Sequence, residues 1–456
     1  MDYKPTLEQI FSAIHSWKDQ FGTYKAHPAT EVAPETLNNA FAEYLKRLEG
    51  NYPFFHPRYA GQMLKPPHPV AQLAYFAAMF INPNNHALDG GPPTSEMEKD
   101  VIRDLARMFH FPENTLGHLT SSGTIANLEA LWVARCLHPD KKIAFSEEAH
   151  YTHERMCGVL GIECVKIPAT ETGEIDLNAL EDKLSTNNIG TVVMTAGTTG
   201  LGVIDPIHEL LPLRDRYNFR VHVDAAYGGF FTLLAYEESP IIPHKALRAI
   251  SECDSVVIDP HKHGLQPYGC GAVLFRDPNL ARFYLHDSPY TYYTSNELHL
   301  GEISLECSRA GAAAGALWLT LKCLPLDANT GLGTILKACI RASRNFHELI
   351  SLDKNWGAYT NPQLDIVTYF PYSDDTSKID EQSQKLFEVA MNSPQEPVFL
   401  SVYRGKAKRI QQQYPNIRAS KNPVRMLRSV FMKPEQETFA PKIFQRLTEH
   451  LNELKA

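Results

Sequence analysis

A chain of 456 residues, with 43% hydrophobic and 21% charged residues, has the composition of a folded protein with roughly two or three domains and a large core. Its net charge of -8 argues against a general nucleic-acid binder, and its 8 cysteines form no CxxC pair, which argues against a zinc ribbon or a disulfide framework. No basic-then-apolar leader opens the chain and no apolar run reaches about 18 residues. We therefore expect a cytoplasmic protein with small-molecule partners, no nucleic acid and no membrane.

An amphipathic helix is predicted at the start of the chain, because apolar residues from Leu7 to Phe21 recur at three- and four-residue steps. Prolines from Pro28 to Pro67 interrupt the segment that follows. Residues 1–60 are thus expected to form an arm of short helices and extended pieces. Packing across a dimer is one way to cover its apolar face.

Strands and helices alternate in the next part of the chain, after helices expected at 70–80 and at 94–109, the latter with Thr94 as its N-cap. The strand-like runs are 142–145, 163–167, 191–195, 220–223, 255–258 and 272–275. The helical runs between them are 125–136, 152–160, 177–185, 207–217 and 245–252. This alternation predicts a mostly parallel sheet covered by helices on both faces, with ligands at the carboxyl ends of the strands.

Two further segments complete the predicted organisation. A Tyr-rich loop at 284–295 and a small-residue helix at 310–322 end a large domain of residues 61–325. Residues 326–456 contain a long helix, strands at 363–370, 398–403 and 426–432, and a closing helix. They are predicted to form a small α+β domain.

Lys262 lies in a polar turn between the two apolar runs at 255–258 and 272–275. A lysine beside buried strands is costly unless its ammonium is paired or used chemically, and a Schiff base with an aldehyde cofactor is one such use. Taken alone, such a lysine more often extends to solvent. Whether Lys262 is catalytic therefore depends on the residues at the other strand ends.

Three other strand ends carry groups that suit a phosphorylated pyridine cofactor. Ser122 and Thr124 precede an apolar helix whose start can bind an anion, or Ser122 can be an ordinary N-cap. Asp224 ends a strand and can hold a pyridine nitrogen protonated, with Ala226 leaving space for the ring, or it can cap the next turn. His150 can stack on a flat ring, although a lone histidine is more often a surface or core residue.

At this point the sequence resembles the pyridoxal-phosphate-dependent group II amino-acid decarboxylases, which include glutamate, aromatic-amino-acid and archaeal tyrosine/aspartate decarboxylases. The motifs that carry the resemblance occur in the family's order over residues 50 to 430: His56-Pro-Arg-Tyr, Met97-Glu, Thr120-Ser-Ser-Gly-Thr, Ala149-His150, Gly197-Thr-Thr, His222-Val-Asp-Ala-Ala-Tyr227, Asp259-Pro-His-Lys262, Cys307-Ser-Arg-Ala-Gly311 and Met426-Leu-Arg428.

The resemblance implies an α/β fold of the type I pyridoxal-phosphate-enzyme class, similar to aspartate aminotransferase, and a homodimer with active sites at the subunit interface. It implies that Lys262 forms the Schiff base with pyridoxal 5'-phosphate, that Asp224 pairs with the ring nitrogen, and that His150 stacks on the ring. It also places His261 near the reacting centre. The remaining residues implied to bind the cofactor are Ser122, Gly123, Thr124, Thr198 and Ala226.

The resemblance also implies substrate contacts. Arg428 is similar to the family arginine that meets the substrate carboxylate, and Gln62 and Lys65 lie in a segment that lines the substrate pocket. Lys65 departs from the hydroxyl residue of many relatives; pointing inward it favours aspartate or glutamate, and pointing outward it is a solvated charge. The proton donor of related enzymes is a loop tyrosine, for which the candidates here are Tyr290, Tyr292 and Tyr293.

The sequence leaves several other readings open. A Rossmann dehydrogenase is disfavoured because Gly197–Gly202 has the spacing GxxGxG, and a metal hydrolase because His150/His153 and His261/His263 lack a full ligand set. Transamination, aldehyde-forming oxidation and sphingoid-phosphate-type carbon-carbon lysis use the same cofactor. A cofactor-free scaffold is the alternative outside enzymes. Decarboxylation of an acidic or aromatic L-amino acid to the amine and CO2 is the predicted reaction.

Overall fold

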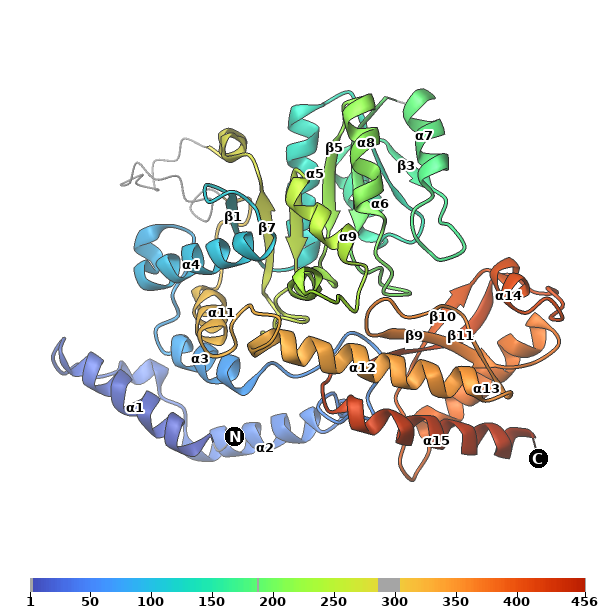
Figure 1. The fold of residues 1–456 in the computed structure, drawn as a ribbon. Helices are drawn as coiled ribbons and strands as arrows, with labels where there is room; N and C mark the ends of the chain where they lie inside the picture. Colours follow the sequence, from blue (N-terminus) through green and yellow to red (C-terminus); the bar gives the residue numbers. More distant parts are fainter. Residues whose placement is uncertain (1–2, 187, 286–303, 456) are drawn as a thin grey trace.

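The computed structural model describes residues 3–186, 188–285 and 304–455, in a large α/β body, a smaller sheet-containing part and an N-terminal arm (Figure 1). Its strands are β1 (Leu116–Thr120), β2 (Lys142–Ser146), β3 (Cys164–Ile167), β4 (Ile189–Thr195), β5 (Arg220–Asp224), β6 (Ser255–Ile258), β7 (Gly271–Phe275), β8 (Trp356–Ala358), β9 (Ile366–Pro371), β10 (Ser401–Gly405) and β11 (Val424–Val430).

The α-helices are α1 (Lys4–Asp19), α2 (Pro34–Leu48), α3 (Pro69–Met79), α4 (Pro92–Met108), α5 (Gly123–Leu137), α6 (Thr152–Leu160), α7 (Leu177–Thr186), α8 (Ile207–Tyr217), α9 (His244–Arg248), α11 (Gly311–Cys323), α12 (Gly331–Leu352), α13 (Thr376–Asn392), α14 (Ala407–Gln413) and α15 (Gln436–Lys455). Short 3₁₀-helices are η1 (Pro28–Thr30), η2 (Leu88–Gly90), η3 (Gly229–Tyr236), η4 (Ala249–Glu252) and η5 (Pro278–Phe283).

The large body is built on a sheet of 7 strands in the order β1-β7-β6-β5-β4-β2-β3. All adjacent pairs from β6 to β3 are parallel, and β7 is antiparallel to both β6 and β1. The predicted mostly parallel sheet is confirmed, and the predicted strands and helices of this region match the observed ones to within a few residues. Strand β1 was not predicted, because Gly117, His118 and Thr120 interrupt its apolar pattern.

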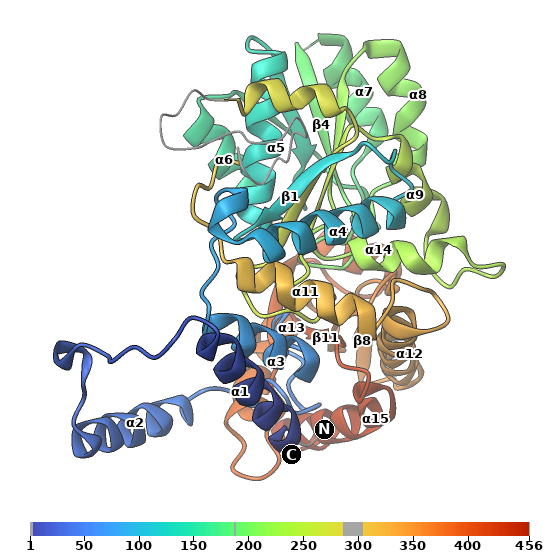
Figure 2. The same ribbon diagram turned by 90° about the vertical axis from the view of Figure 1, so that its left-hand side faces the viewer.

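Helices cover both faces of this sheet, as Figure 2 shows for α5 and α6 on one side and α8 and α9 on the other. Successive residues of β6 face opposite sides. Val256 and Ile258 pack in the cluster that includes α8 and α9, whereas Val257 packs against α5. The continuous apolar run that suits a strand buried on both faces therefore serves two separate cores.

Helix α4 does not begin at Thr94, so that prediction was wrong. The helix starts at Pro92, with prolines in its first turn and Gly91 as its N-cap. Proline suits the first turn of a helix because the N–H groups there have no partner within the helix. Thr94 instead lies within the helix, and its hydroxyl donates to Asn85 Oδ1 at 2.7 Å.

The C-terminal part contains the second sheet, of 4 strands in the order β10-β11-β9-β8, all antiparallel. Helices α12, α13 and α15 contribute to a core with Val367, Tyr369 and Leu427. The predicted small α+β part and its closing helix are confirmed, with β8 as an additional short strand. The domain limits at 60/61 and 325/326 stay predictions.

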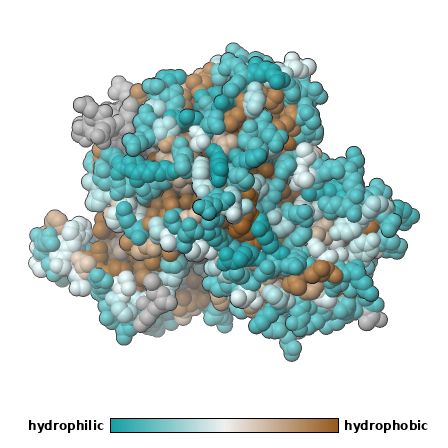
Figure 3. Space-filling view, in the orientation of Figure 1, coloured by the Kyte–Doolittle hydropathy of each residue, from teal (hydrophilic) through white to brown (hydrophobic). Residues whose placement is uncertain are grey.

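The N-terminal arm carries its apolar side chains on the surface. Neither α1 nor α2 contains a buried residue, and α2 extends away from the body (Figures 1 and 2). Hydrophobic surface gathers over α1 and α3 (Figure 3). The exposed apolar residues of α2 are Leu37, Phe41, Tyr44, Leu45 and Leu48. The predicted first helix is therefore present, with its apolar face only partly covered, by contacts of Phe11 with Phe76 of α3 and with Phe80 at the end of that helix.

In the described residues no helix combines the length and the apolar character that crossing a membrane requires. All 8 cysteines are free thiols (Cys136, Cys157, Cys164, Cys253, Cys270, Cys307, Cys323 and Cys339).

Candidate active site

The predicted site residues converge at the carboxyl ends of the parallel strands, around one pocket. Six of them line it: Gly123, Thr124, His150, Asp224, Ala226 and Lys262. Gly197, Thr199, Tyr227 and Asp259, which belong to the motifs named above, also line it, and so do three residues that the sequence did not single out: Asn127, Thr152 and Thr195. Side chains from several strand ends therefore share one pocket.

The start of α5 forms one end of this pocket. Ser122 is the N-cap, and its Oγ accepts the backbone N–H of Ile125 at 3.3 Å. Gly123 follows at a point of close approach, where a Cβ atom would lie 2.7 Å from the carboxylate oxygens of Asp259. The helix dipole and the N–H groups of the first turn favour an anion here. The N-cap role of Ser122 and the anion site are therefore compatible.

Asp224 ends β5 at the floor of the pocket and is only 6% exposed. His153 Nε2 donates to Asp224 Oδ2 at 2.9 Å, and the Ala226 N–H donates to Oδ1 at 3.2 Å. Burial acts to raise the pKa of Asp224, but the hydrogen bond and charge of His153 and the charge of Lys262 hold that pKa well below its usual value. The pocket floor is consequently a carboxylate.

Lys262 Nζ lies 2.9 Å from Asp259 Oδ2, and the Asp259 side chain is only 4% exposed. The turn that carries Lys262 connects β6 to β7, and the two residues are three positions apart within it. The ammonium is therefore paired, which offsets the cost of placing it beside buried strands. Asp259 was present in the Asp-Pro-His-Lys motif, but nothing in the sequence indicated this contact.

The two predicted histidines occupy different places. His150 lines the pocket, its Nδ1 lies 2.8 Å from Thr152 Oγ1, and burial lowers its pKa, so the ring is neutral and suited to stacking. His261 lies beside the pocket without lining it. Its Nδ1 is 2.8 Å from the Cys270 carbonyl oxygen, and burial lowers its pKa as well. A role of His261 at the reacting centre stays a prediction.

Thr198 is fully buried, and its Oγ1 accepts the Val203 N–H at 3.1 Å. This hydrogen bond holds the turn after β4, and the neighbouring Gly197 and Thr199 are the residues that reach the pocket. A direct contact of Thr198 with a cofactor stays a prediction.

The three predicted substrate residues do not line this pocket. Arg428 is buried and donates to the carbonyl oxygens of Thr199 (2.6 Å) and Gly200 (2.9 Å) and to Ser401 Oγ (3.0 Å). Lys65 Nζ donates to the Met432 carbonyl oxygen at 2.9 Å, and burial lowers its pKa, so Lys65 is not a solvated charge. Gln62 is exposed. Tyr290, Tyr292 and Tyr293 lie outside the described residues.

Two histidines that form incomplete metal-ligand sets in the sequence pair with carboxylates in the structure. His153 contacts Asp224, and His263 Nε2 lies 3.1 Å from Asp365 Oδ2. The other oxygen of Asp365, Oδ1, accepts the Tyr227 hydroxyl at 2.6 Å. Across residues 3–186, 188–285 and 304–455, no group of three or more His, Cys, Asp or Glu side chains could hold a metal ion. The Asp365 contacts tie the Lys262 turn to the small sheet.

The sequence is similar to known proteins over most of its length. Residues 55–370 match the model described as the pyridoxal-dependent decarboxylase conserved domain. An L-tyrosine decarboxylase of Enterococcus faecium is 31% identical over 439 residues, which cover 73% of this chain and 72% of that one. A probable L-aspartate decarboxylase of Pyrococcus furiosus is 30% identical over 311 residues, with 68% and 81% covered.

Solved structures share the fold over nearly the whole chain. The structure of Oryza sativa TDC with PLP and tryptamine superposes with a TM-score of 0.79 at 18% identity, covering 99% of this chain and 98% of that one. Mouse CSAD superposes with a TM-score of 0.78 at 19% identity, covering 97% and 98%. The type I pyridoxal-phosphate-enzyme fold predicted from the sequence is confirmed.

Proposed function

The chain belongs to the pyridoxal-dependent decarboxylase family, and from this premise we propose that it removes the α-carboxylate of an acidic or aromatic L-amino acid as CO2 and releases the amine. It is a carboxy-lyase with pyridoxal phosphate as its cofactor. The observation that carries the proposal is the placement of Lys262 and the Asp224 carboxylate in one pocket that also contains the start of α5.

The residues of the pocket fit this cofactor. The anion site at Gly123 and Thr124 suits its phosphate, the buried carboxylate of Asp224 suits a protonated ring nitrogen, and the neutral ring of His150 suits its flat face. When bound, pyridoxal phosphate supplies an aldehyde and an electron-accepting ring, which takes up the electron pair left on Cα as CO2 departs.

The protein's own groups have defined tasks in this proposal. Lys262 binds the cofactor covalently through Nζ, and Asp259, 2.9 Å away, stabilises the ammonium before that bond forms. Asp224 keeps a proton on the ring nitrogen, and His153, which donates to Oδ2, keeps Asp224 ionised. The acid that protonates Cα is one of Tyr290, Tyr292 and Tyr293.

Substrate recognition is assigned to the cationic side chains between the two sheets. Arg428 is proposed to meet the substrate α-carboxylate, and its contacts with Thr199 and Gly200 place it next to a strand end that lines the pocket. Lys65 points inward, which supports a substrate with an acidic side chain, and Gln62 is proposed to lie at the entrance. The two relatives compared above are named as a tyrosine and a probable aspartate decarboxylase, so we propose both substrate classes.

We further propose a homodimer with active sites at the subunit interface. The support is the arm, whose helices α1 and α2 contain no buried residue in the single chain although α2 carries a row of apolar side chains. A fully active protein that sediments as a monomer would contradict this. The cytoplasmic location also stays a prediction.

A screen of L-amino acids for CO2 release by the cofactor-loaded protein tests the reaction. We expect release from aspartate, glutamate or an aromatic amino acid, with stoichiometric amine, without an added keto acid and without oxygen consumption. An absolute requirement for a keto acid would indicate transamination, and aldehyde with oxygen consumption would indicate oxidation. A protein that binds no cofactor would be the scaffold.

A further inference from the structure

A second cavity, of about 560 Å³, lies between the two parts of the molecule and away from the Lys262 pocket. The loop between β3 and α7 contributes Glu171 and Thr172, and the small-sheet part contributes the rest of the lining. Gln412 of α14 donates to Glu171 across the boundary. The other lining residues are His347, Ser351, Ala358, Thr360, Asn361, Gln363, Arg409, Gln413 and Tyr414.

Arg409 is the unusual member of this lining, because it is only 7% exposed and keeps its charge without a carboxylate partner. Among the residues that the structure describes, its guanidinium lies in no ion pair and its Nε has no hydrogen-bond partner. It lies over the ring of Tyr359, with Cζ 4.5 Å from the ring centroid. The Tyr359 hydroxyl also interacts with the Arg409 side chain, and the carboxylate of Glu148, whose oxygens accept the Tyr403 hydroxyl, acts on it through its charge.

Two neighbours in the lining share this property. Thr360 is 4% exposed, and within the described chain neither its Oγ1 nor His347 Nε2 has a hydrogen-bond partner. A buried polar atom without a partner destabilises the folded protein, and a buried charge does so more strongly. Three such groups in one lining therefore indicate that a ligand completes them.

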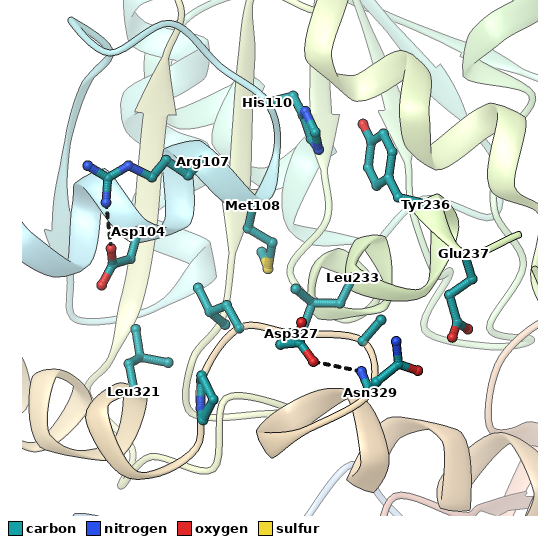
Figure 4. A pocket seen from close by; sticks show the side chains of 13 residues that line it. Asp104, Arg107, Met108, His110, Leu233, Tyr236, Glu237, Leu321, Asp327 and Asn329 are labelled. Carbon is teal, nitrogen blue, oxygen red and sulfur yellow. Dashed lines mark hydrogen bonds and ion pairs between the residues drawn. The ribbon is translucent and has the colours of Figure 1, made fainter.

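Another cavity, of about 510 Å³ beside η3, differs in this respect (Figure 4). There, Arg107 is paired with Asp104 at 3.2 Å, and Asp327 Oδ1 accepts the N–H of Asn329 at 2.8 Å. Glu237 is likewise paired with Lys337. The charged groups of that cavity already have partners within the chain, so nothing in it calls for a ligand.

We infer that the cavity around Arg409 binds a small oxyanion, a carboxylate or a phosphate, as a second ligand site separate from the Lys262 pocket. The guanidinium supplies a planar pair of donors, Thr360 and His347 supply further polar contacts, and Tyr414 and Ala358 supply apolar wall. The size lies in the range of small-molecule sites. Because both parts of the molecule line the cavity, a bound anion stabilises their contact.

Calorimetric titration of the cofactor-saturated protein with inorganic phosphate and, separately, with succinate tests the inference, because the cofactor then occupies the phosphate site at α5. We expect saturable binding of at least one probe, and the two titrations distinguish phosphate from carboxylate. The bound probe should also raise Tm, by mass action on the folded state.

Variants locate the site. Arg409→Met should weaken binding by about tenfold or more and abolish the rise in Tm, and Thr360→Val should weaken binding by about threefold. Arg404→Met removes the same charge from an exposed position in β10 and should leave binding unchanged. If Arg409→Met does not fold, Arg409→Lys, which keeps the charge without the planar donors, replaces it. Absence of saturable binding by either probe, or equal binding in Arg409→Met and Arg404→Met, overturns the inference.

Discussion

The Lys262 pocket and the junction between the two sheets hold buried charges in opposite ways. In the pocket, Lys262 is paired with Asp259 at 2.9 Å and Asp224 with His153 at 2.9 Å. At the junction, defined here by Lys65, Arg428 and Lys433, the cations donate to backbone carbonyl oxygens instead. Within the described residues, none of these three cations has a carboxylate within ion-pair distance.

This difference separates two tasks. A pocket whose charges are balanced in advance holds a cofactor in a fixed electrostatic setting, because its groups need no rearrangement. A junction that retains unpaired positive charge bears a desolvation cost in the free protein, and that cost is reduced when an anion arrives. We therefore expect changes in the pocket to affect the chemistry and changes at the junction to affect anion preference and stability.

The largest effect is expected for Lys262→Ala. Loss of the amine removes covalent attachment of the cofactor, and activity should fall by about 10⁴-fold or more. The measurements are CO2 release and the absorbance of the bound cofactor. Lys245→Ala removes an exposed lysine from α9 and serves as the control. Residual activity within about tenfold of the unmodified protein would refute the role of Lys262.

A change at His153 tests whether this residue keeps Asp224 ionised. Replacing it by Phe removes the hydrogen bond to Asp224, and because burial then dominates, the pKa of Asp224 should rise. The acid limb of the activity profile should move to higher pH, and activity at neutral pH should fall by about tenfold or more. His153→Gln retains an N–H donor and should give a smaller shift. Cofactor absorbance followed against pH checks both, and identical profiles in Phe, Gln and the unmodified protein would show that His153 only fills space.

A change at Lys65 tests whether the junction determines the preference for acidic substrates. If its ammonium meets an acidic side chain of the substrate, Lys65→Met should lower kcat/KM for aspartate and glutamate by about tenfold while leaving aromatic substrates nearly unchanged. The ratio of kcat/KM values for the two substrate classes is the measurement. An equal loss for both classes would assign Lys65 to structure instead of specificity.

The smallest expected effect concerns Lys433, whose pKa burial lowers to about 7 from 10.5. Between these two values the unfolded chain binds more protons at this residue than the folded protein, so the free energy of unfolding should increase with pH across that window. Lys433→Met should flatten this increase, by about 1 kcal/mol or more, in denaturant titrations at pH 7 and pH 9. An unchanged pH dependence would show that the ammonium is better solvated than its burial indicates.

Sequence patterns could predict the elements and the residues that depend on local chemistry. The apolar run of β6, the aspartate at the end of β5 and the glycine at the start of α5 are each recognised from the residues next to them in the sequence. Contacts between distant segments could not be predicted, because periodicity carries no information about them. His153 and Asp224 are 71 positions apart, and Arg428 reaches carbonyl oxygens 228 and 229 positions away. Asp259 was overlooked although it lies in the lysine motif.

Helix α2 has a consequence for how the protein reaches its working form. It is 15 residues long and none of them is buried in the single chain. Isolated helices of about 12–15 residues are only marginally stable in water, since nucleation is costly and packing supplies most of the stability. In the proposed dimer, this helix therefore becomes stable only when two chains meet, and the rate of that step depends on the protein concentration. Activity recovered after refolding should develop faster as the protein concentration increases, whereas a rate independent of concentration would mean that the arm folds without a partner.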